Sequence, residues 1–196
     1  MSVVLVDAGG TNIGSVRYAL QRLGADAALT SDAAAIRAAD KVILPGVGAA
    51  GPGMARLREL DLAGLLRSLT QPVLGVCLGM QLLCAHSEEG DTECLGLIPA
   101  KVRRFAEHPG LRVPHMGWNG LSVQHEHPLL AGLGEGEQAY FVHSYAVPVG
   151  EWTLATAEHG EAFSAMVARG NFHGMQFHPE RSAAVGAKLL KNFLEL

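Results

Sequence analysis

The first half of the chain alternates short apolar runs with segments of helical periodicity, and this alternation constrains the fold most. Four runs have the apolar, β-branched composition of strands, at residues 3–8, 27–31, 41–46 and 72–77. Apolar residues at helical spacing predict helices at 12–23, 32–39 and 80–86, and one or two helices within 54–69. Strands separated by helices of this length need crossover connections, so the pattern predicts a mostly parallel sheet.

After about Leu95 the pattern changes to strand-like segments that follow one another directly, at 100–105, 121–125, 138–147, 152–160, 162–170 and 173–178. The turns at 158–160 and 169–171 predict hairpins, and Ser182 is expected to cap a last helix. The predicted fold class is α/β, with three layers: a mostly parallel central sheet flanked by helices, and an antiparallel strand extension. A flavodoxin-like core in a single domain, residues 1–196, fits a chain of this length.

Composition narrows the class of protein. Hydrophobic residues make up 48% of the chain and charged residues 17%, which predicts a sizeable core. The net charge of −4 and the absence of a long basic tract argue against nucleic-acid binding, and KVRRF at 101–105 is interpreted as a solvated strand edge. No apolar run approaches the ~18 residues of a membrane span. The N-terminus lacks the features of a signal peptide, and 3 cysteines fit a reducing cytosol, so a cytoplasmic location is expected.

Two kinds of ligand site are disfavoured by spacing. Zinc sites use close Cys or His pairs, whereas the cysteines here are seven and ten residues apart, so no metal is expected. The segment GVGAAG at 46–51 matches the dinucleotide fingerprint, but Pro45 and Pro52 frame it and no acidic residue follows at the required place. It is interpreted as a loop with exposed backbone N–H groups, and no cofactor is expected.

Cys77 lies where an expected strand ends and an expected helix begins, within GVCLGMQLLC. Gly75 and Gly79 permit the sharp strand-to-helix turn of a nucleophile elbow. Such a turn places the thiol at the carboxyl edge of a parallel sheet and at a helix N-terminus, which favours the thiolate. Cys84 is expected inside the helix and in the core, and Cys94 in a polar loop. The alternative is that Cys77 is a buried structural thiol.

A cysteine nucleophile needs a base and a group that orients the base. His178-Pro179-Glu180 can supply both. Proline disfavours the helical region for the preceding residue, so His178 is expected to be extended. In an extended chain Glu180 points the same way as His178 and can hold its far ring nitrogen.

Together these motifs resemble the class I (triad-type) glutamine amidotransferases, whose hallmarks are an elbow G-x-C-x-G-x-Q and a late H-P-E, here GVCLGMQ and FHPE. Further segments resemble one family among them, the glutaminase subunits of imidazole glycerol phosphate synthase. They are PGVG at 45–48, VPHMGWN at 113–119, YFVHSY at 140–145 and MQFHPERS at 175–182. HMGWN is the most discriminating of these, and the resemblance covers the whole chain.

The resemblance implies hydrolysis of L-glutamine to glutamate and ammonia through a Cys thioester. Cys77 would be the nucleophile, His178 the proton shuttle and Glu180 the group that orients it. The oxyanion would be held by the backbone N–H of Leu78 and that of Val47 or Gly48. Substrate contacts would come from Gly46, Gln81, Ser144 and Tyr145.

The resemblance also implies a protein partner, a (βα)8-barrel cyclase subunit that receives the ammonia and forms a heterodimer with this chain. Pro114, Met116, Trp118 and Asn119 would lie near the interface, and Arg181 beside the ammonia exit. Ammonia released to water would mostly become protonated and lose its nucleophilicity, so a dry route to the acceptor is needed.

Ala8, Thr11, Ala50 and Arg181 depart from the usual pattern of the family, which leaves the catalytic set intact but puts loop packing and the interface in question. Three other functions are alternatives: a glutaminase subunit of a different synthase, a hydrolase with a cysteine elbow, and a non-catalytic flavodoxin-like binding module. HMGWN argues against the first, and the combined HPE and PGVG motifs against the second. Replacement of Cys77 distinguishes the third.

Overall fold

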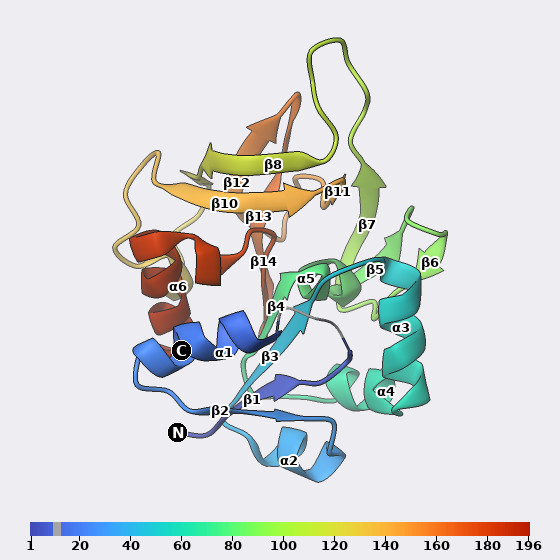
Figure 1. The fold of residues 1–196 in the computed structure, drawn as a ribbon, viewed down its shortest axis with the longest axis vertical. Coiled ribbons are helices and arrows are strands. Elements are labelled where there is room, and N and C mark those ends of the chain that lie inside the picture. Colours follow the sequence, from blue (N-terminus) through green and yellow to red (C-terminus); the bar gives the residue numbers. More distant parts are fainter. Residues whose placement is uncertain (10–12) are drawn as a thin grey trace.

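The computed structural model describes residues 1–9 and 13–196, and Figure 1 shows its ribbon. The central sheet has eight strands in the order β2-β1-β3-β4-β14-β13-β12-β9. Its parallel part consists of β1 (Val3–Val6), β2 (Ala27–Thr30), β3 (Lys41–Gly46), β4 (Val73–Cys77) and β14 (Phe172–Met175). Its antiparallel part consists of β13 (Glu161–Arg169), β12 (Thr153–His159) and β9 (Ser122–Val123). The predicted parallel sheet with an antiparallel extension is therefore confirmed.

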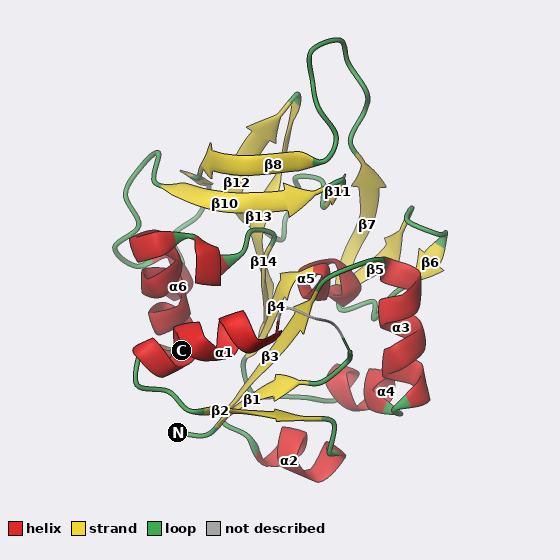
Figure 2. Ribbon diagram, in the orientation of Figure 1, coloured by secondary structure: helices red, strands yellow, loops and turns green. Residues whose placement is uncertain are grey.

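Helices cover both faces of this sheet, as Figure 2 shows. Because side chains alternate along a strand, Val3 and Leu5 of β1 face one way and Val4 and Val6 the other. The first pair packs in a core cluster with α1 (Ile13–Arg22) and α6 (Ala183–Glu195). The second pair packs with α2 (Ala33–Ala38), α3 (Ala50–Glu59), α4 (Leu62–Arg67) and α5 (Leu78–Leu83). Two apolar cores on opposite faces of one sheet make the three predicted layers.

Two smaller sheets adjoin the central one. One pairs β8 (His115–Gly120) with β10 (Gln138–His143), and the other has the order β11 (Tyr145–Ala146), β7 (Ile98–Arg104), β5 (Cys84–Ser87), β6 (Thr92–Glu93). Short 3-10 turns occur at Pro128–Leu130 (η1) and Pro179–Arg181 (η2). In Figure 1 the β8–β10 ribbon stands at one end of the molecule, beyond β4 and α5.

The helix predicted at 80–86 was placed wrongly. It begins at Leu78 and ends at Leu83, and Cys84 opens strand β5, where it pairs with Ile98. The carbonyls at the end of α5 find partners in the segment between β6 and β7, because the N–H groups of Leu95 and Leu97 donate to the carbonyls of Leu82 and Leu83. Tertiary partners therefore end the helix early. Cys84 is nevertheless in the core, as predicted.

Other boundaries also differ. The helical segment predicted from Met54 begins earlier, at Ala50, and it consists of two helices separated at Leu60–Asp61, which agrees with the predicted one or two. Cys94 lies outside the strands, as predicted, but it is buried and not solvent-facing. Ser182 precedes α6 without a side-chain cap, because its hydroxyl bonds elsewhere. The predicted start of the first helix at Asn12, and Thr11 in the loop before it, fall outside the described residues.

Within the described ranges, no helix combines the length and the hydropathy that a membrane crossing requires. The same ranges contain no group of three or more His, Cys, Asp or Glu side chains placed to hold a metal ion.

Candidate active site

Cys77 occupies a sharp turn between β4 and α5. It is the last residue of β4, and its φ of 54° and ψ of −112° are unusual for a residue with a side chain. The chain reverses there because Gly75 and Gly79 let the helix lie directly against the strands. A Cβ on Gly75 would lie 2.6 Å from the backbone of Gly79, and one on Gly79 would lie 1.8 Å from the carbonyl oxygen of Leu44. The elbow predicted from the glycine spacing is therefore confirmed.

His178 and Glu180 lie together at the carboxyl end of β14. Nδ1 of His178 is 2.9 Å from Oε1 of Glu180, and both side chains are buried. His178 is extended, as predicted, with φ −92° and ψ 98°. The predicted route to Glu180 was wrong, because Pro179–Arg181 is a 3-10 turn and not an extended segment. The contact forms because this turn folds the carboxylate back onto the ring.

The backbone of this segment is tied down on two sides. The N–H of His178 donates to the carbonyl of Tyr140, and its carbonyl accepts from the Ser182 hydroxyl at 2.7 Å. The same Ser182 oxygen accepts from the N–H of Tyr140. α6 also approaches closely, since a Cβ on Gly186 would lie 1.8 Å from the carbonyl oxygen of Pro179. His178 is therefore held in place by β10 and α6 together.

The surroundings of His178 favour its protonated form. Burial opposes the charge, but hydrogen bonds to Cys77 and Glu180, together with the charges of these groups, raise the pKa of His178 from 6.5 to about 10. A ring that holds a proton at neutral pH next to a sulfur is suited to donate that proton to a leaving group.

We expect replacement of Cys77 by alanine to lower the pKa of His178 by about 1–3 units, because the hydrogen bond and charge of Cys77 are lost and the burial remains. A titration of the His178 imidazole by NMR measures this. Cys84→Ala is the matched control, since it removes a buried thiol from the same segment that does not contact His178. An unchanged titration in Cys77→Ala would show that Cys77 does not perturb the ring.

A cavity of about 330 Å³ opens beside Cys77, between the loop after β3 and the end of β10. It contains most of the predicted substrate and oxyanion residues, and its lining is Val47, Gly48, Cys77, Leu78, Gln81, Glu89, Pro114, Val142, His143, Ser144, Tyr145 and His178. Gly46 does not line it but packs against the elbow, where an added Cβ would lie 3.0 Å from the N of Gly79. Gly48 has a φ of 97°, which glycine adopts without strain.

Gln81 is fixed by two acceptors. Its Nε2 donates to the carbonyl oxygen of Tyr145 at 2.9 Å and to Oε1 of Gln176 at 3.0 Å. Gln176 is fully buried, and its own Nε2 lies 4.0 Å from Sγ of Cys77. Gln81 is therefore linked to both the far wall of the cavity and the elbow.

The sequence motifs predict no role for Glu89 or Gln176. Glu89 lines the cavity and accepts from the N–H of Ala50 at 2.8 Å, so it also anchors the start of α3. Glutamate in a surface turn is common, and nothing in the sequence indicates that this turn reaches the cavity. Gln176 belongs to the MQFHPERS motif, and this is the one feature of the sequence that could have indicated a role for it.

Four of the five predicted interface and exit residues, all except Asn119, are exposed or border the cavity. Met116 and Trp118 are 64% and 51% exposed on β8, and Pro114 lines the cavity. Arg181 lies 4.2 Å above the ring of Tyr140, whose centroid is 5.9 Å from that of Trp118. Asn119 is half-buried and bonds within the chain. The structure thus brings Trp118 and Arg181, which are distant in sequence, to the same residue, Tyr140.

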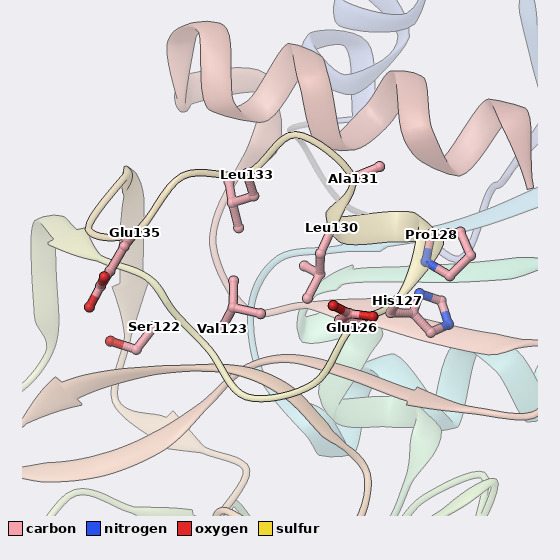
Figure 3. Close-up of a pocket in the computed structure, with 9 residues that line it drawn as sticks. All are labelled: Ser122, Val123, Glu126, His127, Pro128, Leu130, Ala131, Leu133 and Glu135. Carbon is pink, nitrogen blue, oxygen red and sulfur yellow. The ribbon is translucent and has the colours of Figure 1, made fainter.

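A larger cavity, of about 830 Å³, lies elsewhere, beside β9 and η1. Figure 3 shows Ser122 and Glu135 at one end and His127 and Pro128 at the other. The hydroxyl and the imidazole are therefore not arranged as a nucleophile and a base. Size alone would select this cavity, but the elbow cysteine and the His178–Glu180 pair lie at the smaller one.

Comparisons with known proteins agree with this geometry. Residues 4–196 match the family model "Glutamine amidotransferase class-I". "Imidazole glycerol phosphate synthase subunit HisH" of Xanthomonas euvesicatoria pv. vesicatoria is 58% identical over 194 residues, which cover 99% of this chain and 97% of that protein. The protein of the same name from Xylella fastidiosa is 56% identical with the same coverage.

The fold is also similar to solved structures. One of them, a glutamine amidotransferase, has a TM-score of 0.77 at 23% identity and covers 100% of this chain and 98% of its own. At that identity the likeness supports the fold alone, whereas the full-length relatives define the family. The chain belongs to the class-I glutamine amidotransferases and, within them, to the HisH family of imidazole glycerol phosphate synthase subunits.

Proposed function

We propose that this chain is the glutaminase subunit of imidazole glycerol phosphate synthase, with Cys77, His178 and Glu180 as its catalytic residues. The observation that carries the proposal is that the buried elbow cysteine and a histidine oriented by a carboxylate line the same cavity of about 330 Å³. This is the arrangement that nucleophilic catalysis at a carboxamide requires.

In this mechanism Sγ of Cys77 attacks the carboxamide carbon of L-glutamine. The backbone N–H of Leu78, at the start of α5, and that of Val47 or Gly48 stabilise the oxyanion. His178 donates its proton to the departing nitrogen, and a thioester remains on Cys77. His178 then takes a proton from the water that hydrolyses the thioester to glutamate.

Substrate recognition is assigned mainly to the lining of the cavity. Gln81 and the backbone of Ser144 and Tyr145 offer polar groups to glutamine there, and Gly46, which packs against the elbow, completes the proposed set. Glu89 adds a carboxylate that suits the α-ammonium group of an amino acid.

We further propose that residues 1–196 act as one domain in the cytoplasm, bound to a (βα)8-barrel cyclase subunit that uses the ammonia. Three free thiols suit a reducing compartment. The exposed Met116 and Trp118 on β8 suit a protein interface better than solvent. Pro114 and Asn119 complete this surface, with Arg181 at the ammonia exit.

Affinity labelling tests the assignment of the nucleophile. A chloroketone analogue of glutamine should alkylate Cys77, and peptide mass spectrometry locates the adduct. Burial raises the pKa of Cys84, and it raises the pKa of Cys94 to about 11, so both thiols should stay protonated and unreactive at neutral pH. Protection of Cys77 by excess glutamine is the expected control result. An adduct on Cys84 or Cys94 in place of Cys77 would contradict the proposal.

A further inference from the structure

Two buried histidines face each other next to the glutamine cavity. His115 in β8 and His143 in β10 are direct partners in the antiparallel register, and they are 5% and 6% exposed. Nδ1 of His115 lies 3.0 Å from Nε2 of His143. For two ring nitrogens at this distance to form a hydrogen bond, one must donate and the other must accept.

Both ends of this hydrogen-bonded chain are backbone carbonyls. Nδ1 of His143 lies 2.8 Å from the carbonyl oxygen of Tyr145. Nδ2 of Asn119 lies 3.2 Å from Nε2 of His115 and 2.7 Å from the carbonyl oxygen of Glu158. Carbonyl oxygens only accept, so the nitrogen next to each of these two carbonyls must be a donor.

The position of every proton follows. Asn119 must turn its NH₂ group toward Glu158, so the same group donates to Nε2 of His115. His115 then carries its proton on Nδ1 and donates it to Nε2 of His143. His143 carries its proton on Nδ1 and donates it to Tyr145. Each donor in the chain has an acceptor, which makes the network fully satisfied and rigid.

This series of hydrogen bonds ends at Tyr145, which also holds Gln81. The carbonyl oxygen of Tyr145 accepts from Nε2 of Gln81 as well as from His143. With Tyr145 and Gln176 taking both protons of its amide, Gln81 keeps its carbonyl oxygen to accept from a donor group of the substrate. The orientation of Gln81 therefore depends on where the Tyr145 carbonyl is held.

The surroundings keep both rings neutral. The histidines pack among Phe105, Phe141 and Phe163. Burial lowers the pKa of His115 to about 4 and that of His143 to about 3. A proton added to the accepting nitrogen of either ring would set two donors against each other, so the neutral tautomers are the ones that fit.

We propose that His115 and His143 are positioning residues of the glutaminase site, which as a fixed pair of neutral tautomers hold the Tyr145 carbonyl and through it the substrate-binding orientation of Gln81. This inference rests on the proposed function of the cavity. The tautomers themselves can be measured without any activity.

NMR of the ¹⁵N-labelled chain at neutral pH tests the tautomers directly. We expect both His115 and His143 to carry their proton on Nδ1. A proton on Nε2 of either ring would overturn the proposal, whatever the chain catalyses.

The second test is kinetic and uses the complex of this chain with its cyclase. His115→Phe keeps an aromatic ring but removes the donor to His143. The loss of one hydrogen bond should raise KM for glutamine about tenfold. A positioning role should leave kcat within about twofold, because Cys77 and His178 are not changed. His115→Asn, whose amide nitrogen can replace the Nδ1 donor, should restore most of the affinity.

His159→Phe is the matched control. The ring of His159 stacks on His115 with centroids 4.3 Å apart, but its own hydrogen bond goes to the carbonyl of Arg112, which is not part of the His115–His143 network. Its KM should equal that of the wild type. An unchanged KM in His115→Phe, or an equal rise in His159→Phe, would overturn the proposal and leave only a packing role. A wild-type complex without glutaminase activity would instead refute the proposed function.

Discussion

Replacing Cys77 with alanine should reduce glutamine hydrolysis by more than about 10⁴-fold, because the covalent route has no nucleophile without Sγ. Alanine keeps the Cβ that the turn already accommodates, and the residue is only 8% exposed, so the fold should persist. Release of glutamate by the complex with the cyclase and its acceptor nucleotide measures the effect.

Two controls separate loss of chemistry from loss of structure. Synthesis supported by added ammonium salt should survive Cys77→Ala, because the cyclase then needs no glutaminase step. Cys84→Ala should retain glutamine hydrolysis, since Cys84 lies in the core and not in the cavity. Glutaminase activity that persisted in Cys77→Ala would refute the thioester mechanism and support a non-catalytic role for the elbow.

The parallel half of the sheet could be predicted because its strands, apart from the edge strand β2, are buried on both faces. Val3 to Val6 are all buried, and such a strand is a continuous apolar run that sequence patterns reveal directly. β8 could not be predicted in this way. Its residues 115–120 include two glycines and two exposed large side chains, and they form a strand only because β10 pairs with them.

The end of α5 shows the same limit at a single residue. Cys84 continues the apolar pattern of the helix, so local periodicity favours a longer α5. The structure ends the helix because β7 offers Cys84 a partner strand, and that partner lies beyond the reach of a local pattern. Its burial was predictable from its apolar neighbours, but its secondary structure was not.

The candidate site divides in the same way. The elbow at Cys77 and the His178–Glu180 pair depend on neighbouring residues, so motifs located them. Glu89 and His143 reach the cavity only through tertiary packing, and each stands in a segment with another local explanation. The positions of Glu89 and His143 at the cavity therefore come from the structure and not from the sequence.

Replacing Gly79 with alanine should destabilise the protein by more than about 3 kcal/mol, a cost typical of severe overpacking. The added Cβ would lie 1.8 Å from the carbonyl oxygen and 2.9 Å from the carbonyl carbon of Leu44. These are backbone atoms of β3, so no side chain can rotate away to make room. α5 would have to move from the sheet, and with it the N–H of Leu78 beside Cys77. Urea unfolding followed by circular dichroism measures the loss.

Gly64→Ala is the matched control, because it makes the same change in the exposed face of α4. Nothing lies within 4 Å of the added Cβ there, and alanine is the better helix former by about 1 kcal/mol. The control should therefore be as stable as the wild type or slightly more stable. If Gly79→Ala unfolded at the same urea concentration as the wild type, the close contact between α5 and β3 would not exist in solution. If instead Gly79→Ala lowered the free energy of unfolding and Gly64→Ala did not, the elbow would be shown to need glycine because two backbones meet there.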